Sequence, residues 1–186
     1  MSAPLPVEKE YTDAEFAEYA EQDNASRYEL IDGAIYALGS PTPWHQRVFR
    51  HIFTKFSAFF EGKPCEVLSA PLDVHLDANA RRNKNVYQPD IFVICDKRKV
   101  KDNAVYGAPG LVVEVTSPST SRIDYIFKLS NYFKYGVREY WIVDDSNIMV
   151  YIASDNEVRV YSHVFNSLVE SRIFPGLAVD FGEFHN

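Results

Sequence analysis

Hydrophobic residues recur along this chain with two different periods, and each period predicts a type of local structure. The clearest helical pattern spans residues 44–60, where Val48, Ile52 and Phe56 recur every four residues. A proline precedes this segment and a glycine follows it, as is typical of helix boundaries. The pattern therefore predicts one long amphipathic helix.

Two shorter helices are expected on either side of the long one. Thr12, followed three residues later by Glu15, has the form of a capping box and predicts a helix at the N-terminus. Ser119 or Thr120 can cap another amphipathic helix, which ends at Gly136.

Strand patterns account for most of the remaining chain. The segment YELIDGAIYAL predicts a hairpin that turns at Asp32-Gly33. Apolar or alternating runs predict further strands near 65–68, 72–76, 88–94, 111–116, 139–145, 148–153, 157–164 and 177–181. This order of elements predicts an α/β or α+β fold, in which a mixed central β-sheet is flanked by helices and extended by C-terminal antiparallel strands.

Composition restricts the class of protein. A chain of 186 residues suits a single domain, 1–186, and 46% hydrophobic with 24% charged residues is typical of a soluble globular protein. No membrane span or secretory signal is visible. Cys65 and Cys95 lack the spacing of a zinc site or redox motif, so a reducing, cytoplasmic setting is favoured.

The net charge of −7 is unevenly distributed. Residues 1–32 carry nine acidic and two basic residues and so account for the whole −7, which makes 1–25 an acidic helical segment. Residues 81–101 hold seven basic residues against two acidic ones, a local charge of +5. The basic stretch is either a pair of ordinary solvated loops or a rim beside Asp90 that attracts phosphate.

Two carboxylates stand in or beside strongly apolar strands. Asp90 opens one predicted strand, and Glu114 shares a strand face with Val112 and Thr116. Because an unpaired buried carboxylate is costly, each requires a partner. That partner is either a lysine or arginine, with Asp90 capping a turn, or a divalent cation such as Mg²⁺, which takes one or two carboxylates together with phosphate oxygens.

The arrangement of these residues resembles a known nuclease signature. Pro89-Asp90 followed by Glu114-Val115-Thr116 is similar to the PD-(D/E)XK pattern of the restriction endonuclease-like superfamily. Together with YELIDG, PLDVHL, GAPGLVVEVTSPST and YGVREYWIVD, it resembles the Uma-type family of restriction endonucleases over nearly the whole chain. The resemblance implies a restriction endonuclease-like core, with Asp90 and Glu114 as ligands of Mg²⁺ or Mn²⁺.

One position departs from the superfamily pattern. The strand lysine is replaced by Thr116, whose hydroxyl cannot supply a positive charge to a phosphodiester transition state. Family members carry a lysine in the following helix, and Lys128 matches it, on one helix face with Asp124 and Tyr132. The alternative is an ordinary surface ion pair between Asp124 and Lys128.

Further polar residues are weaker candidates. The resemblance makes Glu29 an assisting catalytic acid, although it could be an ordinary exposed strand residue. Asp73 shares a strand face with His75, and His45 opens the long helix. With the basic residues Arg81, Arg82 and Lys84, Asp73 and His45 are the candidates for substrate binding.

The leading hypothesis is a metal-dependent DNA endonuclease in which Asp90, Glu114, Lys128 and Glu29 are catalytic. RNA or branched DNA would require the same chemistry. The alternative is a catalytically inactive nuclease fold that binds nucleic acid or a protein partner. A homodimer is expected, because cutting both strands of a duplex requires two sites.

Overall fold

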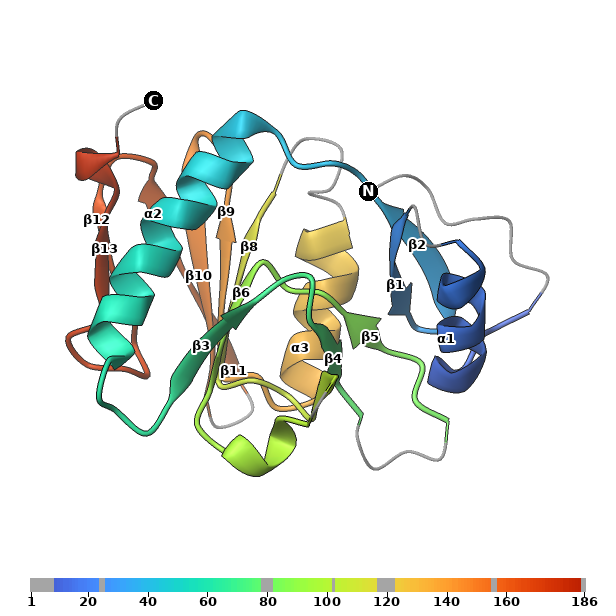
Figure 1. Ribbon diagram of the computed structural model, residues 1–186. Coiled ribbons are helices and arrows are strands. Elements are labelled where there is room, and N and C mark those ends of the chain that lie inside the picture. Colours follow the sequence, from blue (N-terminus) through green and yellow to red (C-terminus); the bar gives the residue numbers. More distant parts are fainter. Residues whose placement is uncertain are drawn as a thin grey trace.

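A computed structural model describes residues 9–23, 26–77, 82–101, 103–116, 123–154 and 157–184. Its centre is a six-stranded mixed sheet with the order β11-β10-β9-β8-β6-β3 (Figure 1). The strands are β3 (Glu66–Ser69), β6 (Ile91–Ile94), β8 (Leu111–Val115), β9 (Glu139–Val143), β10 (Asn147–Ser154) and β11 (Glu157–Val164). β8 and β9 are parallel, and the other neighbouring pairs of this sheet are antiparallel.

A second sheet has five strands in the order β2-β1-β5-β4-β7. These are β1 (Arg27–Ile31), β2 (Ala34–Leu38), β4 (Asp73–His75), β5 (Val86–Tyr87) and β7 (Ala104–Tyr106). A separate hairpin near the C-terminus consists of β12 (Leu168–Glu170) and β13 (Ala178–Asp180). The predicted C-terminal strands are therefore divided between the edge of the central sheet and this hairpin.

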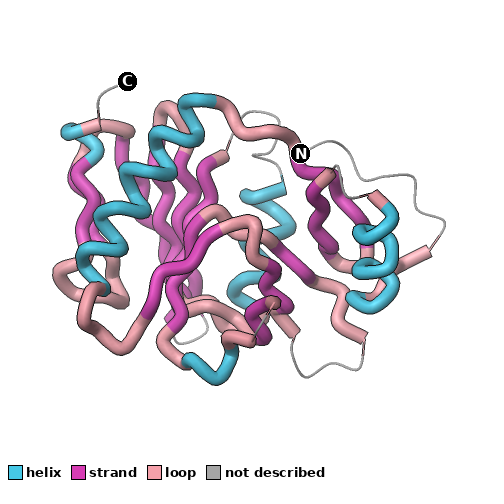
Figure 2. The backbone as a smooth tube through the Cα atoms, viewed as in Figure 1, coloured by secondary structure: helices cyan, strands magenta, loops and turns pink. Residues whose placement is uncertain are grey.

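Helices lie on both sides of the central sheet (Figure 2). α2 (Pro43–Phe60) and the β12–β13 hairpin cover one face, while α3 (Leu129–Lys134) lies between the other face and the five-stranded sheet (Figure 1). A π-helical segment, η2 (Ile123–Lys128), leads directly into α3, and α1 (Asp13–Gln22) packs on the β1–β2 hairpin. η1 (Lys97–Lys99) and η3 (Phe181–Glu183) are short 3₁₀ helices.

The alternation of side chains along β8 and β9 divides the core into two layers. Val113 and Trp141 face α2, where the ring of Phe56 meets that of Trp141 edge to face. Tyr140 faces the other way and packs with Tyr132 of α3. β8 and β9 are buried on both faces. Strands at the centre of a layered fold are typically apolar on both faces.

The α+β class and most of the long elements are as the sequence predicts. The capping box at Thr12 and Glu15 is present, and the hairpin turns at Asp32-Gly33 with both residues at positive φ. The predicted caps Ser119 and Thr120 lie outside the described residues. β5, β7 and β12 were not predicted, because strands of two or three residues are too short to show a period.

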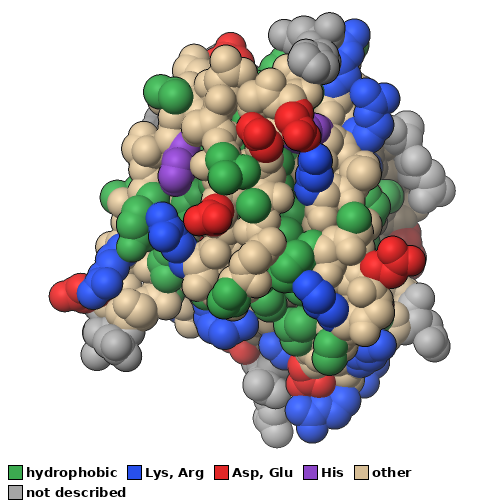
Figure 3. All heavy atoms as spheres, turned by 90° about the vertical axis from the view of Figure 1, so that its left-hand side faces the viewer, with side chains coloured by type: hydrophobic (Ala, Val, Ile, Leu, Met, Phe, Trp, Pro, Cys, Tyr) green, Lys and Arg blue, Asp and Glu red, His purple; other side chains and the backbone are tan. Residues whose placement is uncertain are grey.

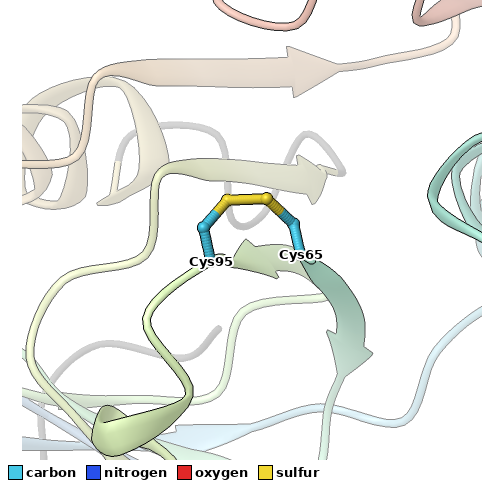
Figure 4. The surroundings of a disulfide bond; sticks show 2 residues. All are labelled: Cys65 and Cys95. Carbon is cyan, nitrogen blue, oxygen red and sulfur yellow. A yellow bond between two sulfur atoms is a disulfide. The ribbon is translucent and has the colours of Figure 1, made fainter. Parts of the chain in front are cut away.

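Cys65 and Cys95, which show neither zinc-site nor redox-motif spacing, form a disulfide with each other (Figure 4). Because β3 and β6 pair with Glu66 opposite Ile94, their register brings Cys65 and Cys95 together just beyond the paired residues.

In the described part of the chain, no helix combines the length and hydropathy required to cross a bilayer. The face that carries α2 and the C-terminal hairpin mixes acidic, basic and hydrophobic side chains (Figure 3).

A buried carboxyl group secures the segment that follows β12. The Glu139 side chain, fully buried on the α2 side of the sheet, accepts a hydrogen bond from Trp141 Nε1 at 2.5 Å. It also accepts hydrogen bonds from Ser171 Oγ and from the backbone N–H groups of Arg172 and Ile173, each at 2.9 Å. These contacts hold the C-terminal hairpin against the central sheet.

Candidate active site

Strand register brings the two carboxylates that stand in apolar runs together. Ile91 of β6 lies opposite Val113 of the antiparallel strand β8. Asp90, which precedes Ile91, therefore lies beside Glu114, which follows Val113. The backbone N–H of Asp90 donates to Glu114 Oε2 at 3.3 Å, and the N–H of Val115 donates to Asp90 Oδ2 at 2.8 Å. Both side chains therefore lie at the same end of the central sheet.

Lys128 reaches Glu114 from the end of η2. Its Nζ lies 2.9 Å from Glu114 Oε1, 2.9 Å from Glu29 Oε2 and 3.6 Å from Asp124 Oδ1. The Lys128 side chain is only 2% exposed, so its pairing with Asp124 is a buried contact and not the surface ion pair of the alternative interpretation. The helical face predicted for Asp124, Lys128 and Tyr132 does point into the site.

Glu29 completes the cluster from the other sheet. It lies on β1 and is fully buried, which excludes the alternative of an exposed strand residue. Its Oε1 accepts hydrogen bonds from Lys128 Nζ at 3.0 Å and from the backbone N–H of Gln88 at 2.8 Å. On the opposite side of Lys128, the Tyr132 hydroxyl donates to Glu114 Oε1 at 2.8 Å.

His45 lies in the first turn of α2 and faces Asp90. Its Nε2 is 3.0 Å from Asp90 Oδ2, and its Nδ1 is buried without a hydrogen-bond partner among the described residues. Thr42 caps the helix by accepting a hydrogen bond from the His45 backbone N–H, which fixes the direction in which this turn begins.

A cavity of about 270 Å³ opens onto the cluster. Asp90, Glu114 and Lys128 line it at one side, with Arg27 and Phe49 among the residues on the others. The side chains of Asp90 and His45 are 18% and 19% exposed, whereas Glu29, Glu114 and Lys128 are almost completely buried. A ligand that enters the cavity therefore meets Asp90 and His45 before the deeper groups.

Acidic groups outnumber cations at this site, because among the described residues Glu29, Asp90, Glu114 and Asp124 line the cavity together with Arg27 and Lys128. Burial raises the pKa of the Glu114 carboxyl from 4.5 to about 8, against the opposing effect of Lys128 and with a further increase from Asp90. Burial likewise raises the pKa of Asp124 to about 6. Burial alone would lower the pKa of Lys128, but the carboxylates of Glu114, Glu29 and Asp124 raise it well above its ordinary value.

The raised pKa of Glu114 predicts a pH-dependent stability. A carboxyl group that binds its proton more tightly in the folded state stabilises the fold below its ordinary pKa of 4.5, and this contribution is lost as pH rises to about 8. We expect Glu114→Gln to remove it. The unfolding free energy of the variant relative to the wild type should rise by on the order of 2–4 kcal/mol between pH 4.5 and 8.

Urea unfolding followed by tryptophan fluorescence, with a chelator present from pH 4.5 to 9, measures this difference. The matched control is Glu170→Gln, because Glu170 is exposed on β12. A difference between Glu114→Gln and the wild type that does not change with pH would contradict the prediction.

The donor groups of the site suit a hard divalent cation. Asp90 Oδ1 accepts no hydrogen bond from the described residues, although Oδ2 accepts two, and Glu114 lies beside it on the next strand. Among the residues the structure describes, no group of three or more His, Cys, Asp or Glu side chains is arranged to hold a metal. Two carboxylates agree with Mg²⁺, which keeps water or substrate oxygens as its other ligands.

The remaining candidates lie away from the cavity. Asp73 accepts a hydrogen bond from Gln88 Nε2 at 2.9 Å and does not line the cavity. Lys84 pairs with Glu10, Arg82 is exposed elsewhere, and Arg81 lies outside the described residues. None of the described basic residues of 81–101 therefore lines the cavity beside Asp90.

Two residues of the site were not predicted. Arg27, on β1, lines the cavity. The charge pattern did not indicate a role for it, because it lies within residues 1–32, which are predominantly acidic. Asp124 was placed on the same helix face as Lys128, but it was given no role in the site. Its spacing of four residues from Lys128 was the available signal, and only the packing of η2 against the sheets shows that the pair is buried.

Comparison with known proteins identifies the family. The model of the Uma2 family, described as "Putative restriction endonuclease", matches residues 13–182. An uncharacterized protein of Synechocystis sp. is 32% identical over 123 residues, which span 66% of this chain and 60% of that protein.

A crystal structure described as "a putative nuclease belonging to DUF820", from Anabaena variabilis, shares the fold with a TM-score of 0.71 at 20% identity. The match covers 93% of this chain and 96% of that one. The signature residues, the nuclease-like fold and the match over residues 13–182 lead to one conclusion: the chain belongs to the Uma2 family of restriction endonuclease-like proteins.

Proposed function

We propose that this protein is a divalent-metal-dependent endonuclease that hydrolyses phosphodiester bonds of DNA. The observation that carries the proposal is the convergence of Asp90 and Glu114 from neighbouring strands with Lys128 from the adjoining helix on one cavity. Family membership supports the same chemistry. The choice of DNA over RNA rests on the resemblance to restriction endonucleases.

Asp90 and Glu114 are the residues that would hold Mg²⁺ or Mn²⁺. Such an ion neutralises charge on a phosphodiester and lowers the pKa of water. The protein prepares the position by fixing both carboxylates with backbone N–H groups, so neither has to reorient when a cation enters. His45, at the start of α2, restrains Oδ2 of Asp90.

Lys128 supplies the positive charge that Thr116 cannot. Glu29 and Glu114 hold the ammonium between the two sheets, so its position is fixed before substrate arrives. A charge that is already oriented stabilises negative charge developing on a phosphoryl group without reorganisation. Glu29 acts here through Lys128, as a positioning residue.

Cleavage assays with an Asp90 variant test the proposal. The wild type should cut plasmid or oligonucleotide DNA with Mg²⁺ or Mn²⁺, and Asp90→Asn should reduce the rate by at least about 100-fold. Asp73→Asn is the matched control, because Asp73 is a carboxylate outside the cavity. RNA and branched DNA in the same assay distinguish the substrates. A folded wild type that cleaves no nucleic acid with either metal would exclude the enzyme.

The alternative is a catalytically silent member of the family that binds nucleic acid or a protein, and one observation favours it. Glu29, Glu114 and Lys128 already satisfy one another as buried partners. A metal titration separates the two functions. Mg²⁺ or Mn²⁺ at 100 times its dissociation constant should stabilise a metal-binding protein by ~2.7 kcal/mol, and a rise in melting temperature measures this. An unchanged melting temperature in the wild type favours the silent protein.

A further inference from the structure

A hydrophobic patch lies on the surface away from the cavity. Ile126, Phe127, Val158 and Val160 are 53%, 39%, 54% and 52% exposed, and they come from η2 and β11. Three of them line a groove of about 390 Å³ with the more buried Leu129, Phe133 and Tyr151. Contiguous exposed apolar surface of this kind marks an interaction site more often than scattered single residues do.

The patch borders a free sheet edge. β11 pairs with β10 on one side, and no described residue pairs with its other side. The strand is eight residues long, and Val158 and Val160 project from the face that Tyr151 of β10 shares. A long edge strand with exposed apolar side chains can accept another strand through its unpaired backbone groups.

We propose that this surface is a homodimer interface, in which β11 pairs antiparallel with β11 of a second copy about a two-fold axis through Val160. In this register Val160 lies opposite its own counterpart, so the two grooves come together. The same register places Glu157 opposite His163 at both ends and Arg159 opposite Tyr161. Glu157 is opposite in charge to a protonated His163, and the Arg159 guanidinium meets the aromatic ring of Tyr161, which makes the edge complementary to itself.

A register shifted by one residue on each strand is less favourable. It would centre the axis on Tyr161 and place Arg159 opposite His163, which are alike in charge when the histidine is protonated. Strand pairing of this kind needs no conformational change, because the edge is already extended. These arguments favour a second copy over an unrelated partner, which would have no reason to match this charge order.

The interface would lie directly behind the catalytic helix. η2 directs Asp124 and Lys128 inward and Ile126 and Phe127 outward within the same turn. A partner that covers the outer side would therefore hold the turn that carries Lys128. The dimer itself is independent of the proposed nuclease function.

Sedimentation equilibrium of the full chain tests the interface. We expect the wild type to be dimeric at 10–100 µM and Val160→Lys to be monomeric, because a lysine pair on the axis places two charges together in an apolar contact. Leu168→Lys is the matched control, since Leu168 is 54% exposed on β12, outside the patch. It should remain dimeric. Circular dichroism verifies that each variant folds.

Mixing two variants tests the position of the axis. Val160→Glu alone should also be monomeric, but an equimolar mixture with Val160→Lys should form heterodimers, because the two side chains meet at the axis. A wild type that is monomeric at 100 µM overturns the proposal and leaves the patch to a different partner. A dimeric Val160→Lys, or a mixture that remains monomeric, overturns this interface.

Discussion

Replacing Lys128 with methionine should lower the unfolding free energy at neutral pH by about 3–5 kcal/mol, because Glu29, Glu114 and Asp124 would lose the cation that pairs with all three in the described part of the chain. Removing one partner of a buried ion pair leaves the other charges uncompensated. The destabilisation should diminish at acid pH, where the carboxyl groups bind protons. Metal-dependent cleavage should fall by at least about 100-fold as the oriented charge is lost.

Urea unfolding and cleavage rates measure the two effects, and Lys134→Met, on the α3 helix that continues from η2, is the matched control, because Lys134 is exposed. A divalent cation should restore part of the lost stability in the Lys128 variant, since it can replace the positive charge among the carboxylates. If Lys128→Met unfolds at the urea concentration of the wild type, the buried ammonium does not stabilise the cluster.

Replacing Glu139 with alanine should reduce the unfolding free energy by about 4 kcal/mol. The substitution removes the acceptor of Trp141 Nε1, the Ser171 hydroxyl and two backbone N–H groups, and leaves these donors buried on the α2 side of the sheet. An unsatisfied buried donor costs ~1–3 kcal/mol, and part of the total should be recovered by entry of water. The C-terminal hairpin should also become more sensitive to proteases.

Chemical denaturation and limited proteolysis test this prediction. Glu170→Ala provides the control, because this nearby carboxylate is exposed on β12 and its loss should change the unfolding free energy by less than about 0.5 kcal/mol. Equal stability of the Glu139 and Glu170 variants would show that the buried contacts do not anchor the hairpin. The Lys128 substitution leaves buried carboxylates without their cation, whereas the Glu139 substitution removes a buried carboxylate. Only the Lys128 substitution should affect the proposed cleavage activity.

The sequence predicts the part of the site that depends on local periodicity. Alternation along β8 sets the side of the sheet to which Glu114 points, and four-residue spacing places Asp124, Lys128 and Tyr132 on one helical face. Short-range rules are sufficient for these placements. They also account for the capping box at Thr12 and for α2.

The remainder depends on contacts between distant segments. Nothing local to Glu29 indicates that β1 meets β5 and places this carboxylate against Lys128, 99 residues away. The pairing of Cys65 with Cys95 follows from the register of β3 and β6, and the burial of Asp124 follows from the docking of η2. Lys128 approaches Glu114 from another element, in a chain whose strand carries Thr116 where the superfamily pattern has a lysine.

Glu29 belongs to the five-stranded sheet, whereas Asp90, Glu114 and Lys128 belong to the central sheet and its helix. The proposed active site is therefore shared between two sheets that must stay in contact with each other. A substitution that loosened their contact could spare the larger hydrophobic core, and with it most of the circular dichroism signal, yet separate the acid from the amine. For the proposed nuclease, the cleavage rate would then report the contact between the sheets more sensitively than any spectroscopic measure of folding.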